Sequence, residues 1–354
     1  MFTRLVGVGI SLLISSLGAA FALDIPQPTT PEQLQAFYPS VPDAINAALV
    51  YQQAQKARVP GKYGEDFPLL GDAQFKFPVR PIEPKVKEAV QEELKNNETT
   101  LRLLHRAAAM TSCRFPIDMT KGQAIELPHL SVMRDFARLL ALQAVIAADG
   151  GNPQLAAQAV LDIMAAAQSL RNEPVIISQL CRVACWNISI DALEQVVNRV
   201  QLDEESLLQI QEALAKADDP QAMTRAFQGE LCIYMNVKTA TPEERAAQRR
   251  ALDDYMRKHS ELSEAECRAL GPSPRVDPSP EEKQKLMQEM ASKISESRLP
   301  HADFMKLVPP LSARKAMAAQ QSSGQNGADQ PRLHGWSMAM VATVRLAARA
   351  AAAQ

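Results

Sequence analysis

Beyond its first 22 residues, the sequence lacks the short motifs that mark the common types of catalytic and cofactor site. It has no H-E-x-x-H, C-x-x-C or G-x-S-x-G motif, no G-x-x-x-x-G-K-S/T loop and no G-x-G-x-x-G turn. The histidines lack the spacing of metal ligands: His105, His129, His259, His301 and His334. These absences argue against the familiar metalloenzymes, hydrolases and nucleotide-binding proteins. We expect no cofactor and no metal site.

The sequence also lacks an excess of either charge and has few aromatic residues. Its 38 Lys and Arg oppose 40 Asp and Glu, a formal net charge of −2. That balance predicts neither nucleic-acid binding nor adhesion to an anionic membrane. Aromatic residues make up only 5% of the chain, while alanine, leucine, glutamine and glutamate abound. Because these four residues favour helices and aromatic residues favour strands, the composition predicts a helical protein.

Long apolar runs are absent except at the N-terminus, where the first 22 residues read as a secretory signal. Arg4 precedes an apolar stretch over 5–17, and Ala20-Phe21-Ala22 supplies the small-x-small pattern that signal peptidase requires. The alternative is an uncleaved anchor through residues 5–22, because about 18 apolar residues is the lower limit for a span. We expect export to the periplasm or beyond the cell, with no membrane span after cleavage.

Cysteine is scarce, and its number is odd for an exported chain. With five cysteines, at least one thiol is free or pairs between molecules. Cys181 and Cys185 lie four residues apart on a predicted helix, which separates their Cβ atoms by about 5–6 Å, whereas a disulfide needs about 3.5–4.5 Å. We therefore predict that both are core residues. Cys232 and Cys267 form the one candidate disulfide.

Helix starts are clearly marked, several by a capping residue followed by proline, as in Thr30-Pro31 and Ser279-Pro280. Apolar periodicity and these caps predict helices near 31–37, 42–57, 84–109, 129–149, 153–171, 175–197, 203–217, 220–236, 242–258 and 280–297, with a last helix from Trp336. Successive helix pairs predict an all-α fold of stacked antiparallel hairpins, an irregular α-solenoid or tetratricopeptide-like stack without a clean repeat period.

Proline-rich and low-complexity stretches divide the chain. The stretch from Val59 to Pro84 carries four aromatic residues, so we expect an extended strap packed on the helical body. We divide the chain into a signal peptide (1–22), N-terminal helices with the strap (23–84), a helical core (85–236), charged helices with a linker at 271–279 (237–300), and C-terminal helices with a disordered segment at 320–331 (301–354).

The stretch TSCRFPIDMTKGQAIELPHL, residues 111–130, follows neither flanking helical pattern and is the best candidate for a functional site. In a functional interpretation, its charged side chains converge as an acid–base or ligand-binding group. The candidates are Arg114, Asp118, Lys121, Glu126 and His129, with Arg134 on the next helix.

A structural interpretation of the same stretch competes with the functional one. Cys113, Phe115, Ile117 and Met119 alternate with polar residues, which predicts an extended strip docked on the helices by its apolar side. Asp118, followed by Thr120-Lys121-Gly122, is typical of a turn whose carboxylate accepts a backbone N–H two residues on. We prefer the structural interpretation.

Several motifs occur together in the central third of the chain. Phe115-Pro116-Ile117-Asp118 is followed by LPHL at 127–130, ARLL at 137–140, a Gly-Asn helix break at 151–152 and EPVIISQL at 173–180. This set resembles an uncharacterised family of exported or membrane-anchored all-helical bacterial proteins, with the likeness covering roughly residues 103–215. The family carries no assigned activity, so the resemblance implies a helical fold and export but no particular chemistry.

These observations lead to two expectations about function. The first is an exported, non-enzymatic helical scaffold that holds another protein in the cell envelope, with no nucleic-acid partner. The second is a periplasmic enzyme or small-ligand binder that uses Arg114, Asp118 and His129. The second requires these side chains to line one cavity.

The signal sequence gives the first testable prediction. N-terminal sequencing of the protein isolated from cells should find a chain that begins at Leu23, because signal peptidase cleaves after Ala22. A chain from native membranes that retains residues 5–22 would contradict cleavage and establish the anchor.

Overall fold

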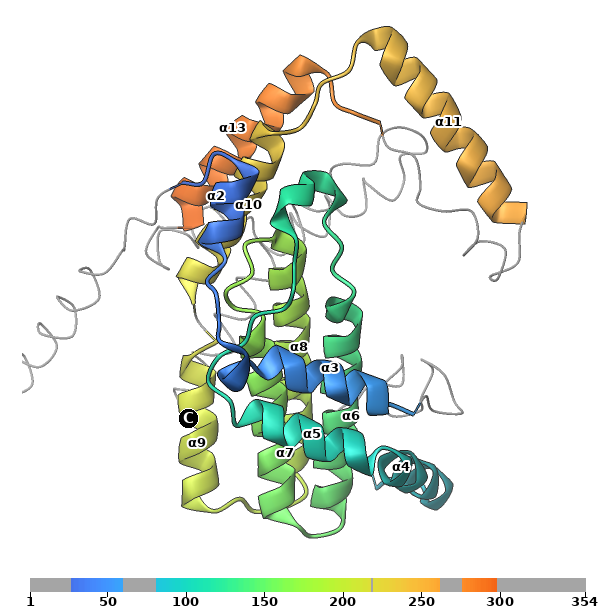
Figure 1. Cartoon of the computed structure of the whole chain (residues 1–354). Helices are drawn as coiled ribbons and strands as arrows, with labels where there is room; N and C mark the ends of the chain where they lie inside the picture. Colours follow the sequence, from blue (N-terminus) through green and yellow to red (C-terminus); the bar gives the residue numbers. More distant parts are fainter. Residues whose placement is uncertain (1–26, 60–80, 218, 262–275, 298–354) are drawn as a thin grey trace, which may run out of the picture.

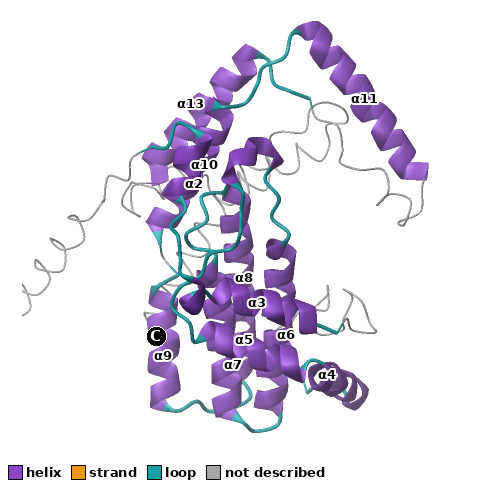
Figure 2. Cartoon of the chain, in the orientation of Figure 1, coloured by secondary structure: helices purple, strands orange, loops and turns teal. Residues whose placement is uncertain are grey.

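The computed structural model describes residues 27–59, 81–217, 219–261 and 276–297, and this part of the chain is all-helical, as the composition and periodicity predict (Figures 1 and 2). It contains no strand, only one isolated bridge between Asn46 and Ser112. The helices are α2 (Pro31–Phe37), η1 (Asp43–Ile45), α3 (Ala47–Ala57), α4 (Pro84–Asn96), α5 (Glu98–Ala108), η2 (Met119–Ala124), α6 (His129–Asp149), α7 (Pro153–Ser169), α8 (Ile176–Val197), α9 (Glu204–Ala215), α10 (Pro220–Met235), α11 (Pro242–Glu261) and α13 (Pro280–Ser297).

The predicted capping residues begin the helices as expected. In the box of α11, the Glu244 N–H donates to Thr241 Oγ1 at 3.3 Å and the Thr241 N–H donates to Glu244 Oε2 at 2.8 Å. Ser279 and Glu282 form the same reciprocal pair before α13. Thr30, Asn152 and Asp219 each accept a backbone N–H of the helix that follows. These bonds satisfy N–H groups that the helix itself leaves without partners.

The centre of the molecule is a bundle in which α6, α7 and α8 pack on one another and α9 packs on α7. The turn between α6 and α7 contains Gly151, whose φ of 73° is a left-handed conformation that glycine adopts at low cost. Small side chains let the backbones of α6 and α7 approach closely, and five of them are fully buried: Ala137, Ala141, Ala144, Ala156 and Ala159. The predicted α6–α7 hairpin is thus confirmed.

A second layer, made of α3 and α5, lies across the face of α6 and α7 (Figure 1). One long helix was expected over 84–109, and that prediction is wrong, because α4 and α5 meet at a break at Asn97. The buried Asn97 amide accepts the Val59 N–H at 2.9 Å and donates to the Val59 carbonyl at 3.1 Å. At Asn97 the chain makes these hydrogen bonds to Val59 and does not continue as one helix.

The remaining helices extend from the upper end of the bundle. α10 packs on α13, α8 and α2, and α11 projects away from this group (Figure 1). Among the described helices, none is long and apolar enough to cross a membrane. The signal peptide, residues 60–80 of the strap, Cys267, and the C-terminal segment with its helix from Trp336 all lie outside the described residues.

Gly229 of α10 lies directly against the backbone of Pro174. A Cβ atom at this position would overlap the backbone carbonyl of Pro174, which lies in the connection between α7 and α8. The absence of a side chain at residue 229 therefore sets how closely α10 can approach that connection.

We predict that Gly229→Ala lowers the free energy of unfolding by about 1–3 kcal/mol, because the added methyl group forces the two backbones apart. In an unhindered helix the same change would stabilise by about 1 kcal/mol. Urea unfolding followed by circular dichroism measures the difference. Gln211→Ala on the exposed face of α9 is the control and should stay within about 0.5 kcal/mol. A Gly229→Ala protein as stable as the parent would contradict the close approach.

Candidate functional site

Residues 113–119 form the extended strip that the alternation predicts. Phe115, Ile117 and Met119 are buried, while Pro116 and Asp118 are exposed. The Phe115 N–H donates to the Tyr38 hydroxyl at 2.9 Å, which ties the strip to the end of α2. The structural interpretation of this segment is confirmed.

The charged residues in the middle of the stretch find their partners within their own loop. Asp118 Oδ1 accepts the Thr120 N–H at 3.0 Å and the Thr120 hydroxyl at 2.5 Å, and these bonds lower the pKa of the exposed Asp118 carboxyl. Lys121 and Glu126 form an exposed ion pair at 3.3 Å. Such contacts shape a turn and leave no group directed at a cavity.

His129 instead belongs to a buried polar cluster. Its Nε2 is hydrogen-bonded to Glu173 Oε1 at 2.9 Å, and its ring stacks on Phe115 with centroids 4.2 Å apart. Glu173 is fully buried. A buried carboxylate requires such a partner, so the pair fixes the start of α6 to the connection between α7 and α8.

The two arginine candidates take separate surroundings. The Arg114 guanidinium lies 4.6 Å from the centroid of the Tyr38 ring, a cation–π contact. Arg134 is exposed on α6, where its charge helps to lower the pKa of the Cys181 thiol. Among the described contacts, none joins Arg114, Asp118, His129 and Arg134 into one group.

The thiols of the described part sit in protected positions. Burial and the nearby Glu173 charge raise the pKa of Cys113 to about 12. Cys181 and Cys185 are buried core residues, as predicted, and the Cys181 thiol donates to the Leu130 carbonyl at 3.2 Å. Cys232 is free and donates to the Thr30 carbonyl at 3.4 Å. Its candidate partner, Cys267, lies outside the described residues.

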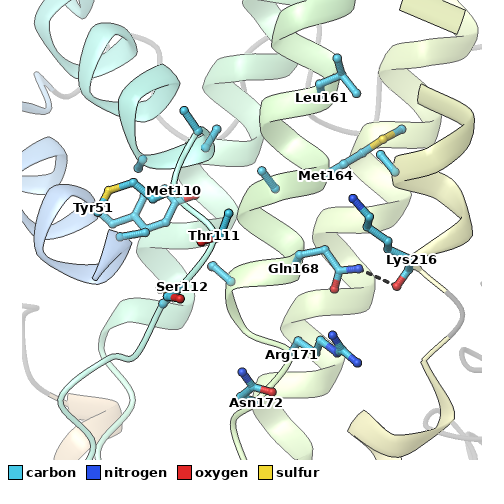
Figure 3. Close-up of a pocket in the computed structure, with 18 of the residues that line it drawn as sticks. Tyr51, Met110, Thr111, Ser112, Leu161, Met164, Gln168, Arg171, Asn172 and Lys216 are labelled. Atoms are coloured by element: carbon cyan, nitrogen blue, oxygen red, sulfur yellow. Dashed lines mark hydrogen bonds between the residues drawn. The ribbon is translucent and has the colours of Figure 1, made fainter. Parts of the chain in front are cut away.

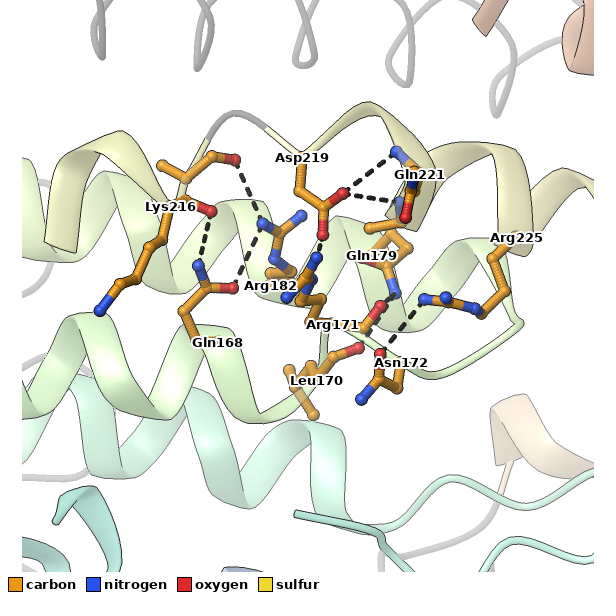
Figure 4. Close-up of polar contacts among 12 residues, drawn as sticks. Gln168, Leu170, Arg171, Asn172, Gln179, Arg182, Lys216, Asp219, Gln221 and Arg225 are labelled. Atoms are coloured by element: carbon orange, nitrogen blue, oxygen red, sulfur yellow. Dashed lines mark hydrogen bonds and ion pairs between the residues drawn. The ribbon is translucent and has the colours of Figure 1, made fainter. Parts of the chain in front are cut away.

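A dense set of polar contacts holds the connection between α7 and α8, residues 170–175 (Figure 4). The Gln179 amide, buried in α8, donates to the carbonyls of Leu170, Arg171 and Glu173 at 3.0, 3.3 and 2.9 Å. Arg182, one turn further along, donates to the Ala217 carbonyl at 3.1 Å. The Leu170 and Ala217 carbonyls also accept the backbone N–H groups of Glu173 and Asp219, so the amide of Gln179 matters most for the buried Glu173 carbonyl.

Asp219 links this connection to α10. Its carboxylate accepts the backbone N–H groups of Gln221 and Ala222 and forms an ion pair with Arg171 (Figure 4). Beside this pair, the Arg225 guanidinium donates to Asn172 Oδ1 at 3.2 Å. Arg171 and Asn172 are therefore held in fixed positions at the edge of the bundle.

These two residues border a cleft of about 450 Å³ between the α3–α5 layer and the α7–α9 pair. Met110, Thr111 and Ser112 lie on one side, and Met164, Gln168 and Lys216 lie on the other (Figure 3). The Gln168 amide donates to the Lys216 carbonyl at 2.5 Å and so joins α7 to the end of α9. The cleft size falls in the range of about 300–1,000 Å³ that is typical of small-molecule sites.

Trp186 of α8 forms part of the cleft wall and is fully buried. Its indole N–H has no acceptor in the described part of the chain. Indole nitrogen is a donor only, and a buried donor without an acceptor costs about 1–3 kcal/mol. The cleft lining thus mixes apolar and polar side chains, and the fully buried Trp186 carries a donor that has no acceptor among the described residues.

The described residues contain no group of three or more His, Cys, Asp or Glu side chains that could hold a metal ion. Comparison of the chain with protein-family models, curated proteins and solved structures finds no match. The site therefore has to be interpreted from its own geometry.

Sequence reasoning missed the residues that form the cleft. Tyr51, Met164, Trp186 and Lys216 come from four different helices, and each fits an ordinary helical pattern in its own segment. The one local signal of the cleft in the sequence was the run QSLRN at 168–172, which is more polar than the alanine-rich segment of α7 before it.

The thiol environments predict an order of alkylation in the native protein. At pH 8, a pKa of about 12 leaves Cys113 roughly a thousandfold less thiolate than an ordinary thiol has. Peptide mass mapping after iodoacetamide treatment should find Cys113 unmodified in the folded protein and fully modified in guanidinium. Cys181, whose pKa is lowered by Cys185 and Arg134, should react before Cys185. Rapid native alkylation of Cys113 would show an activated thiol and contradict this account.

Proposed function

We propose that this protein is a small-molecule binding protein whose ligand occupies the cleft between α5 and α7. The observation that carries the proposal is the cleft of about 450 Å³, in which apolar side chains adjoin the polar groups held at its edge. Supporting apolar contacts come from Tyr51, Leu161 and Met164.

The lining of the cleft favours binding over catalysis. Among the described residues that line it, none is histidine, aspartate or glutamate, the side chains that most often transfer protons in enzymes. Its one thiol, Cys113, has a pKa of about 12 and is a poor nucleophile. The arrangement can hold a ligand but supplies no acid–base pair to transform it.

The scaffold function expected from the sequence draws less support from this geometry. A partner-binding surface is usually a contiguous apolar patch. The large apolar side chains that are exposed in the described part are spread over several elements: Ile45, Val59, Leu155, Ile177, Val197, Leu207, Leu208 and Met256. We therefore propose the cleft as the functional site. In view of the signal sequence, we propose that binding occurs outside the cytoplasm.

Methionine methyl signals offer a direct test of the proposal. Met110 and Met164 line the cleft, whereas Met290 is buried between α10 and α13. In protein labelled with ¹³C at the methionine methyl groups, titration with octanoate or 1-octanol should shift the Met110 and Met164 signals in a saturable way. The Met290 signal should remain unchanged.

A pair of matched variants localises the binding. Ala165→Phe places a bulky ring in the cleft and should abolish the shifts, because Ala165 lines it. Ala215→Phe makes the same change at an exposed position of α9 outside the cleft and should leave them intact. If neither probe shifts the two signals in the folded parent, or if the Ala165→Phe protein still responds, the proposal is wrong.

A further inference from the structure

The charged side chains that line the cleft are all of one sign. Arg171 and Lys216 are its charged lining residues, and both are cations. This bias departs from the chain as a whole, in which 40 acidic residues slightly exceed 38 basic ones. A site lined by cations in a weakly acidic protein attracts anions.

Ion pairing within the described residues leaves this positive charge partly uncompensated. Asp219 forms an ion pair with Arg171 while it also caps α10 (Figure 4). Lys216 is exposed at the cleft edge and has no ion pair in the part of the chain that the structure describes. Arg225 lies nearby. Burial lowers the pKa of its guanidinium, the negative charge of Asp219 opposes this shift, and the positive charge of Arg171 adds to it.

The uncharged groups at the cleft edge also offer donors in preference to acceptors. Asn172 Oδ1 accepts a hydrogen bond from Arg225, which leaves the Asn172 amide N–H groups for a ligand. Gln168 Oε1 accepts from Arg182 at 3.4 Å and is likewise occupied. The ligand that complements this edge must carry acceptor oxygens and negative charge.

Resting on the proposed function, we infer that the ligand is an amphipathic carboxylate. Its carboxylate lies at the cleft edge, where the Lys216 ammonium donates to it. Its apolar portion lies against Met110, Leu161 and Met164. This arrangement follows the usual division of a small-molecule site into apolar walls and a few polar groups that fix orientation.

Three probes with the same eight-carbon chain test the inference: octanoate, 1-octanol and octylammonium. The shift of the Met164 methyl signal measures each dissociation constant. Octanoate should bind at least about tenfold more tightly than 1-octanol, and octylammonium should bind most weakly, because only octanoate complements the cationic edge. Lys216→Met, which keeps the aliphatic stem, should weaken octanoate about five- to tenfold and leave 1-octanol unchanged. Lys95→Met on the exposed face of α4 makes the same charge change elsewhere and should alter neither.

The outcomes separate this inference from the proposed function. If none of the three probes binds, the small-molecule function itself fails. If the three bind with equal affinity, the cleft is a ligand site but the carboxylate assignment is wrong. Octanoate binding that is preferred yet unaffected by Lys216→Met would overturn the role given to Lys216.

Discussion

The structure depends on satisfying the buried polar groups of residues 170–175, the connection between α7 and α8. This short segment precedes α8, and the carbonyls of Leu170 and Glu173 and the Glu173 carboxylate are removed from water. Each such group would cost about 1–3 kcal/mol without a partner. Gln179 donates to three of the carbonyls, and His129 is hydrogen-bonded to one oxygen of the carboxylate, Oε1, while Oε2 has no partner among the described residues. From α10, Glu230 accepts the Ile176 N–H at the start of α8.

The same contacts position the cleft. Because Gln179 fixes the backbone of the connection, Arg171 and Asn172 are held at the cleft edge, where Asp219 and Arg225 complete their hydrogen bonds. Gly229 allows α10 to approach closely enough for those bonds to form. The hydrogen bonds that hold the α7–α8 connection therefore also position polar side chains along the edge of the cleft. The function that we propose makes use of those side chains.

Local patterns predicted much of the fold but little of the site. Capping residues marked helix starts such as those at Pro31 and Pro280, because a cap is bonded within four residues of itself. The break at Asn97 was not predicted because Asn97 is hydrogen-bonded to Val59, which lies 38 residues away. The sequence around Asn97 itself keeps a helical pattern. His129 was chosen from the sequence, but its partner, Glu173, lies 44 residues further along. Phe115, His129 and Glu173 come from three separate sequence motifs and meet in this cluster, in which Phe115 stacks on His129.

The most direct measurement of this central constraint is the stability of Gln179→Leu, which keeps the side-chain bulk and removes the amide donor. We predict that urea unfolding will show a loss of about 1–3 kcal/mol, since the buried Glu173 carbonyl loses its donor and the carbonyls of Leu170 and Arg171 each lose one hydrogen bond. Gln209→Leu, the same change at an exposed position of α9, should alter stability by less than about 0.5 kcal/mol. A Gln179→Leu protein as stable as the parent would show that residues 170–175 do not need this amide, and would contradict the account.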